Sequence, residues 1–138
     1  MLSQEQKLLL IGQIKDLSGV PIRTIRYYES LGLLNSSGRT EGGFRQFSSD
    51  VLTRLSFIKR CQNLGLSLQE ISEILQVYDR GKPACHKIQQ KLQDKILEID
   101  QQVQHLLTLQ SELKELLSGW HSLTTKPEDR ICPNIQKD

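Results

Sequence analysis

A long stretch without helix breakers constrains the fold of this chain most. Between Pro83 and Gly119 there is neither Gly nor Pro, and apolar residues recur at alternating steps of three and four, the spacing of a heptad repeat. The repeat, interrupted by Lys95 and Gln110, consists of Cys85, Ile88, Leu92, Ile99, Val103, Leu106, Leu113 and Leu117.

A helix over residues 82–118 would be about 50 Å long. That is too long to bury its apolar stripe against the preceding part of a 138-residue chain. We therefore expect a coiled coil with a second copy, and hence a homodimer. The alternative is a helix that folds back on its own chain, but no later helix is available to cover it.

The segment Gly12–Leu34 predicts two short helices with a tight joint. Ile14 and Leu17 give the first helix an apolar side, Ser18-Gly19 ends it, and Pro21 occupies a first-turn position of the second. Ile22, Ile25 and Tyr28 provide packing in the second helix, while other parts of its circumference carry Arg23, Thr24, Arg26 and Tyr27. Two such helices, the second basic near its start, are typical of a helix-turn-helix that enters the DNA major groove. A helical hairpin with a solvated basic face is the alternative.

The distribution of charge supports nucleic-acid binding more than the net charge does. The formal net charge is only +2. Residues 11–60 hold eight Lys and Arg against four Asp and Glu, whereas residues 61–138 hold nine against eleven. The positive excess therefore lies on the predicted helix-turn-helix part, as binding to a phosphate backbone requires.

Residues 35–47 predict a β-hairpin. Gly42-Gly43 lies between short flanks and suits the turn, with Phe44 and Phe47 able to anchor it. Arg39 and Arg45 lie on either side, so the hairpin would act as a wing against the DNA backbone. An ordinary flexible loop is the alternative.

Two further helices complete a compact unit over residues 11–81. Ser48-Ser49-Asp50 begins one, which ends at Leu64-Gly65 and keeps helical apolar spacing at Val51, Leu52, Leu55, Ile58 and Cys61. Ser67 and Glu70 form a capping-box pattern for the next, whose apolar side carries Leu68, Ile71, Ile74, Leu75 and Tyr78. Residues 1–10 are expected to be a loose leader whose final leucines are able to pack on the first helix.

The cysteine count and the N-terminus indicate a cytoplasmic protein without a membrane segment. The N-terminal apolar run is too short for a signal peptide or a membrane span. Three cysteines at wide spacing argue against a disulfide framework and for free thiols or metal ligands.

Residues 11–118 resemble the MerR family of transcriptional regulators. The matching stretches are IGQIKDLSGVPIRTIRYYESLGLL, GRTEGGFRQFSSDVLTRLSFIKRCQNLGLSLQEISEIL and the long helix. The tail ICPNIQ is similar to the Cys-Pro segment of metal-responsive members, which makes residues 119–138 an effector-binding tail. The resemblance implies a mainly α fold, with a winged helix-turn-helix joined by a long antiparallel coiled coil in a homodimer. It also implies binding to double-stranded promoter DNA with an over-long spacer, where the inducer-bound dimer distorts the DNA for RNA polymerase.

The resemblance also assigns roles to residues of the DNA-binding unit. Arg23, Thr24 and Arg26 would contact the major groove or adjacent phosphates. The contacts that position the DNA backbone would come from Tyr27, Tyr28, Arg39 and Arg45. Thr24 and Tyr28 have inward packing as an alternative role.

The family's divalent-metal sensors have a cysteine at the start of the dimerisation helix and another in the tail, which correspond to Cys85 and Cys132. At a helix start, backbone N–H groups favour a thiolate. In an antiparallel dimer, Cys85 of one subunit can meet Cys132 of its partner, and Cys61 is expected to be a core residue. The predicted effector is a soft ion, with Hg²⁺, Pb²⁺ or Cd²⁺ favoured and Zn²⁺ possible.

The tail departs from the usual pattern of these sensors, which place another cysteine before the Cys-Pro. Here Leu123, Thr124 and Thr125 occupy that region. Two thiolates suffice for linear Hg²⁺, whereas Zn²⁺ prefers four ligands, with candidates in His121, His86, Asp129 or water. Sensing of oxidants or electrophiles through the thiols, without metal, is the alternative function. A thiol hydrolase built on Cys85-His86 is disfavoured, because neighbouring helical residues do not face each other.

Overall fold

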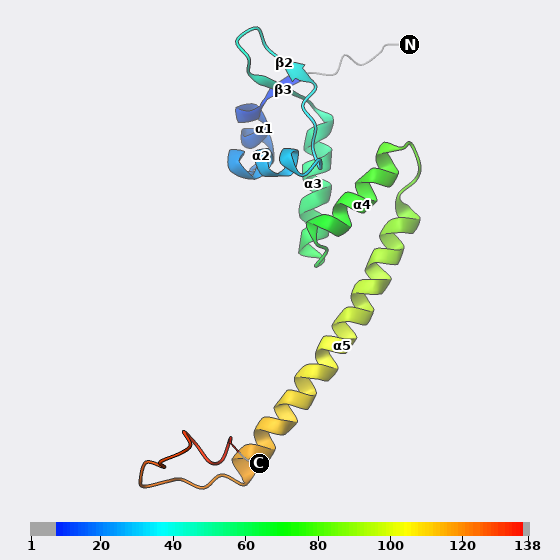
Figure 1. Ribbon diagram of the computed structural model, residues 1–138. Helices are drawn as coiled ribbons and strands as arrows, with labels where there is room; N and C mark the ends of the chain where they lie inside the picture. Colours follow the sequence, from blue (N-terminus) through cyan, green and yellow to red (C-terminus); the bar gives the residue numbers. More distant parts are fainter. Residues whose placement is uncertain (1–7, 137–138) are drawn as a thin grey trace. The chain divides into compact units, whose positions relative to one another are not determined.

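The computed structural model describes residues 8–136, which form two compact units divided between Leu92 and Gln93. The described part is mainly helical with one small sheet, as predicted (Figure 1). Its elements are β1 (Leu8–Leu10), α1 (Ile11–Ser18), α2 (Ile22–Ser30), β2 (Gly38–Arg39), β3 (Arg45–Ser48), α3 (Asp50–Asn63), α4 (Leu68–Asp79) and α5 (Cys85–Ser118).

The predicted pair of short helices is confirmed as α1 and α2. Gly19 ends α1 with φ 74°, the left-handed region that favours glycine, and its N–H donates to the Lys15 carbonyl oxygen at 2.8 Å. Pro21 immediately precedes α2 with φ −59°, where its missing N–H is not needed. Leu17, however, is 65% exposed, so of the two predicted apolar residues of α1 Ile14 is the buried one.

The hairpin over residues 35–47 is also confirmed, but it belongs to a three-stranded sheet in the order β1-β3-β2. Antiparallel pairing places Leu9 opposite Phe47 and Arg39 opposite Arg45. The expectation of a loose leader is wrong for residues 8–10, because β1 pairs with β3 and buries Leu9. Residues 1–7 lie outside the described part. Phe47 anchors the hairpin in the core, whereas Phe44 is 68% exposed beside the turn and anchors nothing.

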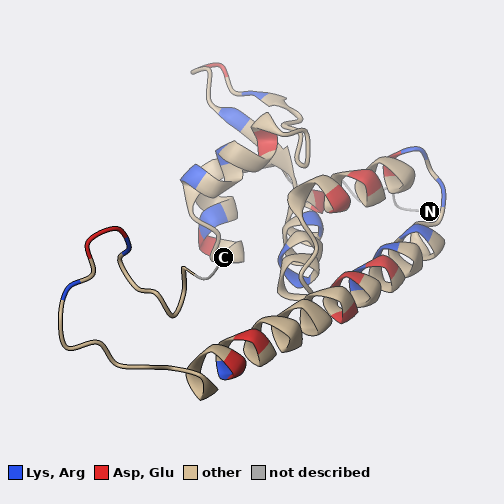
Figure 2. Ribbon diagram, turned by 60° about the horizontal axis from the view of Figure 1, so that its bottom comes forward, with Lys and Arg blue, Asp and Glu red and all other residues tan. Residues whose placement is uncertain are grey.

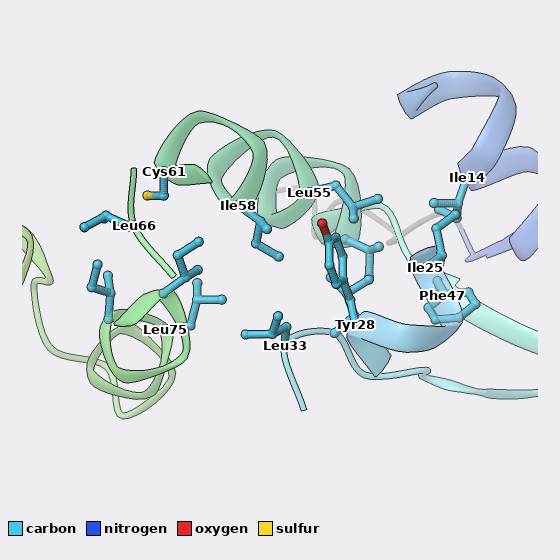
Figure 3. Packing of buried hydrophobic residues seen from close by; sticks show 14 of the residues in the cluster. Ile14, Ile25, Tyr28, Leu33, Phe47, Leu55, Ile58, Cys61, Leu66 and Leu75 are labelled. Atoms are coloured by element: carbon cyan, nitrogen blue, oxygen red, sulfur yellow. The ribbon is translucent and has the colours of Figure 1, made fainter. Parts of the chain in front are cut away.

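One apolar core joins the helix-turn-helix, β3, α3 and α4 (Figure 3). The predicted core positions of α3 are buried or half-buried, including Cys61. The capping box of α4 is present, since the Ser67 hydroxyl accepts from the Glu70 N–H at 3.1 Å and the Glu70 carboxylate accepts from the Ser67 N–H at 3.4 Å. Tyr78 is 62% exposed, so the apolar side of α4 ends at Leu75.

Helix α5 begins at Cys85 and runs for 34 residues. Ile88 and Leu92 pack against the core of the first unit. The remaining stripe stays open to solvent in the single chain, with Ile99, Val103, Leu106, Leu113 and Leu117 between 46% and 67% exposed. Such a stripe is consistent with the predicted coiled coil. No helix within residues 8–136 is long and apolar enough to cross a membrane.

Candidate nucleic-acid interface and effector site

Helix α2 exposes the cationic face that the sequence predicts. Because Ile25 and Tyr28 point into the core, the 3.6-residue period turns Arg23, Arg26 and Tyr27 outward, and all three are exposed. Thr24 is half-buried. The outward set provides two guanidinium groups and one phenol for base edges and phosphates.

A groove of about 790 Å³ runs between the two short helices and the hairpin. Arg26 of α2 lines it together with Arg39 and Arg45 of the hairpin, and Asp16 of α1 is the acidic residue in its lining. Figure 2 colours the Lys and Arg positions of this unit blue along the ribbon, whereas α5 carries both signs of charge. Three cations that converge on one groove make a surface suited to a phosphate backbone.

The two hairpin arginines differ in their partners. The Arg39 guanidinium donates to the Gly43 carbonyl oxygen at 3.2 Å, so it lies along the turn with its charge unneutralised by that contact. Arg45 forms an ion pair with Glu29 of α2 at 2.5 Å, and the Glu29 side chain is only 17% exposed. The Arg45 pair ties the hairpin to α2 and offsets part of its charge.

Tyr28 is placed differently from the prediction that it positions the DNA backbone. It is 8% exposed and lies among the buried apolar side chains (Figure 3). Its hydroxyl donates to the Gln62 side-chain oxygen of α3 at 3.1 Å. Its helical position directs it inward with Ile25, so its phenol is engaged in packing. We therefore leave Tyr28 out of the proposed contact surface.

The three cysteines are free thiols in unlike surroundings. Cys61 is buried in the core, where desolvation raises the pKa of its thiol despite the opposing charge of Arg60. Cys85 is exposed as the first residue of α5. His86 follows it and is also exposed.

Cys132 lies in a loop that hydrogen bonds hold together. The Gln136 side-chain oxygen accepts from the N–H groups of Ile131 and Cys132 at 2.5 and 2.8 Å. In turn, the Cys132 carbonyl oxygen accepts from the N–H groups of Ile135 and Gln136 at 3.1 and 3.0 Å. The half-buried thiol therefore belongs to a defined turn.

Asn134 connects this turn to the end of α5. Its side-chain oxygen accepts from the His121 N–H at 3.0 Å, and its amide donates to the His121 carbonyl oxygen at 2.8 Å and to the Cys132 Sγ at 3.7 Å. Desolvation raises the pKa of the Cys132 thiol, but hydrogen bonds from Asn134 and from the Ile135 N–H outweigh it. The pKa therefore lies below its ordinary value.

The structure thus brings Cys132 and His121 together through Asn134, and it places Cys85 and His86 in the first unit. Within residues 8–136 no group of three or more His, Cys, Asp and Glu side chains is arranged to hold a metal ion. The sequence prediction missed Asn134 and Gln136 as organisers of the tail. The available signal was their position just after Cys132-Pro133, where turn-forming residues gather.

Two family descriptions match this chain. A MerR HTH family regulatory protein model covers residues 9–77, and a MerR DNA-binding model covers residues 52–116. The chain belongs to the MerR family. Its members are transcription regulators that bind promoter DNA, which confirms the prediction that this chain is not an enzyme.

Individual relatives cover most of the chain. It is 41% identical over 106 residues to a mercuric resistance operon regulatory protein of Bacillus cereus, covering 77% of this chain and 80% of the relative. It is 39% identical to a ZntR homologue of Haemophilus influenzae, with coverage of 77% and 78%. Among solved structures, the regulator PbrR691 of Ralstonia metallidurans in complex with lead(II) matches with a TM-score of 0.73 and 31% identity, covering 85% of this chain and 91% of that one.

Proposed function

We propose that the protein is a homodimeric, metal-responsive transcriptional regulator that binds promoter DNA and activates transcription when a soft metal ion binds Cys85 and Cys132. The observation that carries the metal part of the proposal is the hydrogen-bonded turn around Cys132. A thiol that accepts hydrogen bonds has its anionic form stabilised, and the thiolate is the form that binds metal.

The open stripe of α5 supports the homodimer. Five heptad positions from Ile99 to Leu117 are about half or more exposed in the single chain, and a second copy of the same helix supplies a complementary stripe. An antiparallel arrangement brings the start of one helix to the end of the other. Cys85 of one subunit then meets Cys132 of its partner, and each dimer has two sites.

The donor set decides which metal fits. Cys85 is exposed and Cys132 half-buried, so two soft sulfur ligands are available, which favours Hg²⁺, Pb²⁺ or Cd²⁺. A third ligand from His121 or His86 would extend the set toward Zn²⁺. A relative named for mercuric resistance and a solved relative in complex with lead(II) support a metal effector.

DNA recognition is proposed for Arg23, Thr24 and Arg26 of α2, with Tyr27, Arg39 and Arg45 on the backbone. The groove that Arg26 shares with the two hairpin arginines supports this division. Two such units on one dimer would contact two half-sites. Metal binding changes the relation between the units, and DNA held at both half-sites is deformed at a cost of a few kcal/mol. The deformation would align the promoter elements for RNA polymerase.

A variant series tests the proposal. Cys132→Ser and Cys85→Ser should each retain operator binding but lose metal-dependent activation in a transcription assay with purified polymerase. Cys61→Ala is the matched control, because Cys61 is buried in the core and should affect stability without removing the response. Full metal-dependent activation by Cys132→Ser would overturn the scheme.

Thiol-based sensing of oxidants or electrophiles without metal is the second candidate function. It is favoured by the same lowered pKa of Cys132, since a thiolate is also the form that reacts. Thiol titration with and without Hg²⁺, Pb²⁺, Cd²⁺ and Zn²⁺ separates the two candidates. Metal sensing requires protection of Cys85 and Cys132 together and two ions per dimer.

A further inference from the structure

Asn134 differs from the other residues of the tail because its side chain is buried. It is 8% exposed, whereas every other side chain of residues 119–136 is exposed or half-buried. A buried amide costs free energy unless its hydrogen bonds are made. The burial of this amide is therefore offset by the hydrogen bonds that its side chain makes.

The contacts of Asn134 close a loop. Its oxygen and its amide bind both backbone groups of His121, thirteen residues earlier, at 3.0 and 2.8 Å. His121 lies three residues beyond the end of α5 at Ser118. The same amide nitrogen also donates to the Cys132 Sγ at 3.7 Å. One side chain thus joins the chain after the long helix to the sulfur of the tail.

We propose that Asn134 is a positioning residue that holds Cys132 beside the end of α5 before any metal is bound. Its relevance to the effector rests on the proposed function, because Cys132 is the tail ligand there. A sulfur that is already positioned needs little ordering of the chain when a metal binds, so affinity rises. The half of the metal site that the tail contributes is then already in place before the metal binds.

The chemistry of the side chain makes the inference specific. Leu has the same branched shape, with larger terminal groups, but neither donates nor accepts, so Asn134→Leu removes all three contacts. Asn134→Asp keeps the acceptor for the His121 N–H but has no donor for the His121 carbonyl oxygen or for the Cys132 sulfur. Asn134→Leu therefore removes both contacts that close the loop and the contact with the sulfur, whereas Asn134→Asp keeps one of the two loop-closing contacts.

Hydrogen exchange in the metal-free dimer tests the positioning directly. In the wild-type protein the His121 amide should exchange slowly, and Asn134→Leu should accelerate its exchange by about tenfold or more. Ser122→Ala, an exposed position in the same loop, is the matched control and should leave exchange unchanged. Wild-type exchange at the rate of an unstructured chain, or equal protection in Asn134→Leu, would overturn the inference.

Cd²⁺ titration, followed by thiolate-to-metal absorption, provides the second measurement. Asn134→Leu should weaken Cd²⁺ binding by about tenfold, and Asn134→Asp should also weaken it. Operator affinity without metal should stay that of the wild type, which a general loss of structure would not allow. In a Cys132→Ser background Asn134→Leu should have no further effect on Cd²⁺, and an equal effect there would overturn the inference.

The two proposals fail separately. If the wild-type protein takes up no Cd²⁺ at Cys85 and Cys132, the proposed metal response is wrong, while slow exchange of His121 still supports the role of Asn134. If Cd²⁺ binds both cysteines and Asn134→Leu changes neither exchange nor affinity, the metal response stands and the positioning role is refuted.

Discussion

Removal of one hairpin arginine should change the salt dependence of DNA binding by a predictable amount. Arg39 lines the groove beside α2, and its guanidinium donates to a neutral carbonyl oxygen. Its charge is therefore available to a phosphate. Arg39→Ala is the cleanest perturbation, because the residue is exposed in a two-residue strand and contributes nothing to the core.

The expected size follows from counterion release. Each phosphate contact contributes about 0.9 to the slope of log K against log salt on duplex DNA. A dimer with Arg39 on both subunits loses two contacts, so its slope should fall by about two. Between about 50 and about 200 mM salt, the variant should lose about tenfold less affinity than the wild type over the same range.

Arg45 should behave differently because Glu29 already offsets its charge. Arg45→Ala should therefore lower the slope less than Arg39→Ala, although both residues line the groove. Lys114→Ala, on the exposed surface of α5, is the control and should leave the slope unchanged. Fluorescence anisotropy with a labelled operator duplex at several salt concentrations measures all three. An Arg39→Ala slope equal to that of the wild type would refute the assignment of the hairpin to the DNA backbone.

Three further predictions concern the scaffold. Tyr28→Phe should lower the free energy of unfolding by about 1 kcal/mol in a urea titration, through loss of its hydrogen bond, and leave DNA affinity unchanged. The hydrogen bond and charge of Lys91 lower the pKa of Glu73. This ion pair therefore stabilises the fold at pH values above the ordinary carboxyl pKa. That stability is lost as pH falls below about 4.5, and Glu73→Gln should flatten this acid loss in thermal unfolding scans. Leu106→Lys should shift the dimer to monomer in analytical ultracentrifugation, whereas His105→Lys beside the stripe should not.

Local patterns made most of the DNA-binding unit predictable. The helix ends at Gly19 and Ser67 follow from backbone conformation and capping chemistry within a few residues of each position. The hairpin turn follows in the same way, since Gly43 takes φ 83°. What sequence could not supply was contact at long range. Strand β1 exists because Leu9 pairs with Phe47, far along the chain.

The candidate site was predictable in its residue types and not in its arrangement. The family resemblance implies Cys85 and Cys132 as ligands, and a thiol at a helix start has a general electrostatic rationale. The helical spacing of Ile25 and Tyr28 predicted that Tyr28 packs inward, as the structure shows, whereas its role at the DNA backbone was implied by the family resemblance. Asn134 was missed because its role depends on His121, a contact that no periodicity encodes.

The contacts of the first unit explain how an event at Cys85 can reach the DNA-binding surface. The first turns of α5 pack on the core through Ile88 and Leu92, and Lys91 forms an ion pair with Glu73 of α4. At the end of α4, Asp79 pairs with Arg54 of α3 at 2.6 and 3.2 Å, and Arg54 donates to the Leu33 carbonyl oxygen at 2.8 Å, just after α2. Close-packed elements shift together rather than deform. On the proposed scheme, a metal that ties Cys85 to the tail of a second subunit therefore acts on α4, α3 and α2 in turn, without contact between the metal and DNA.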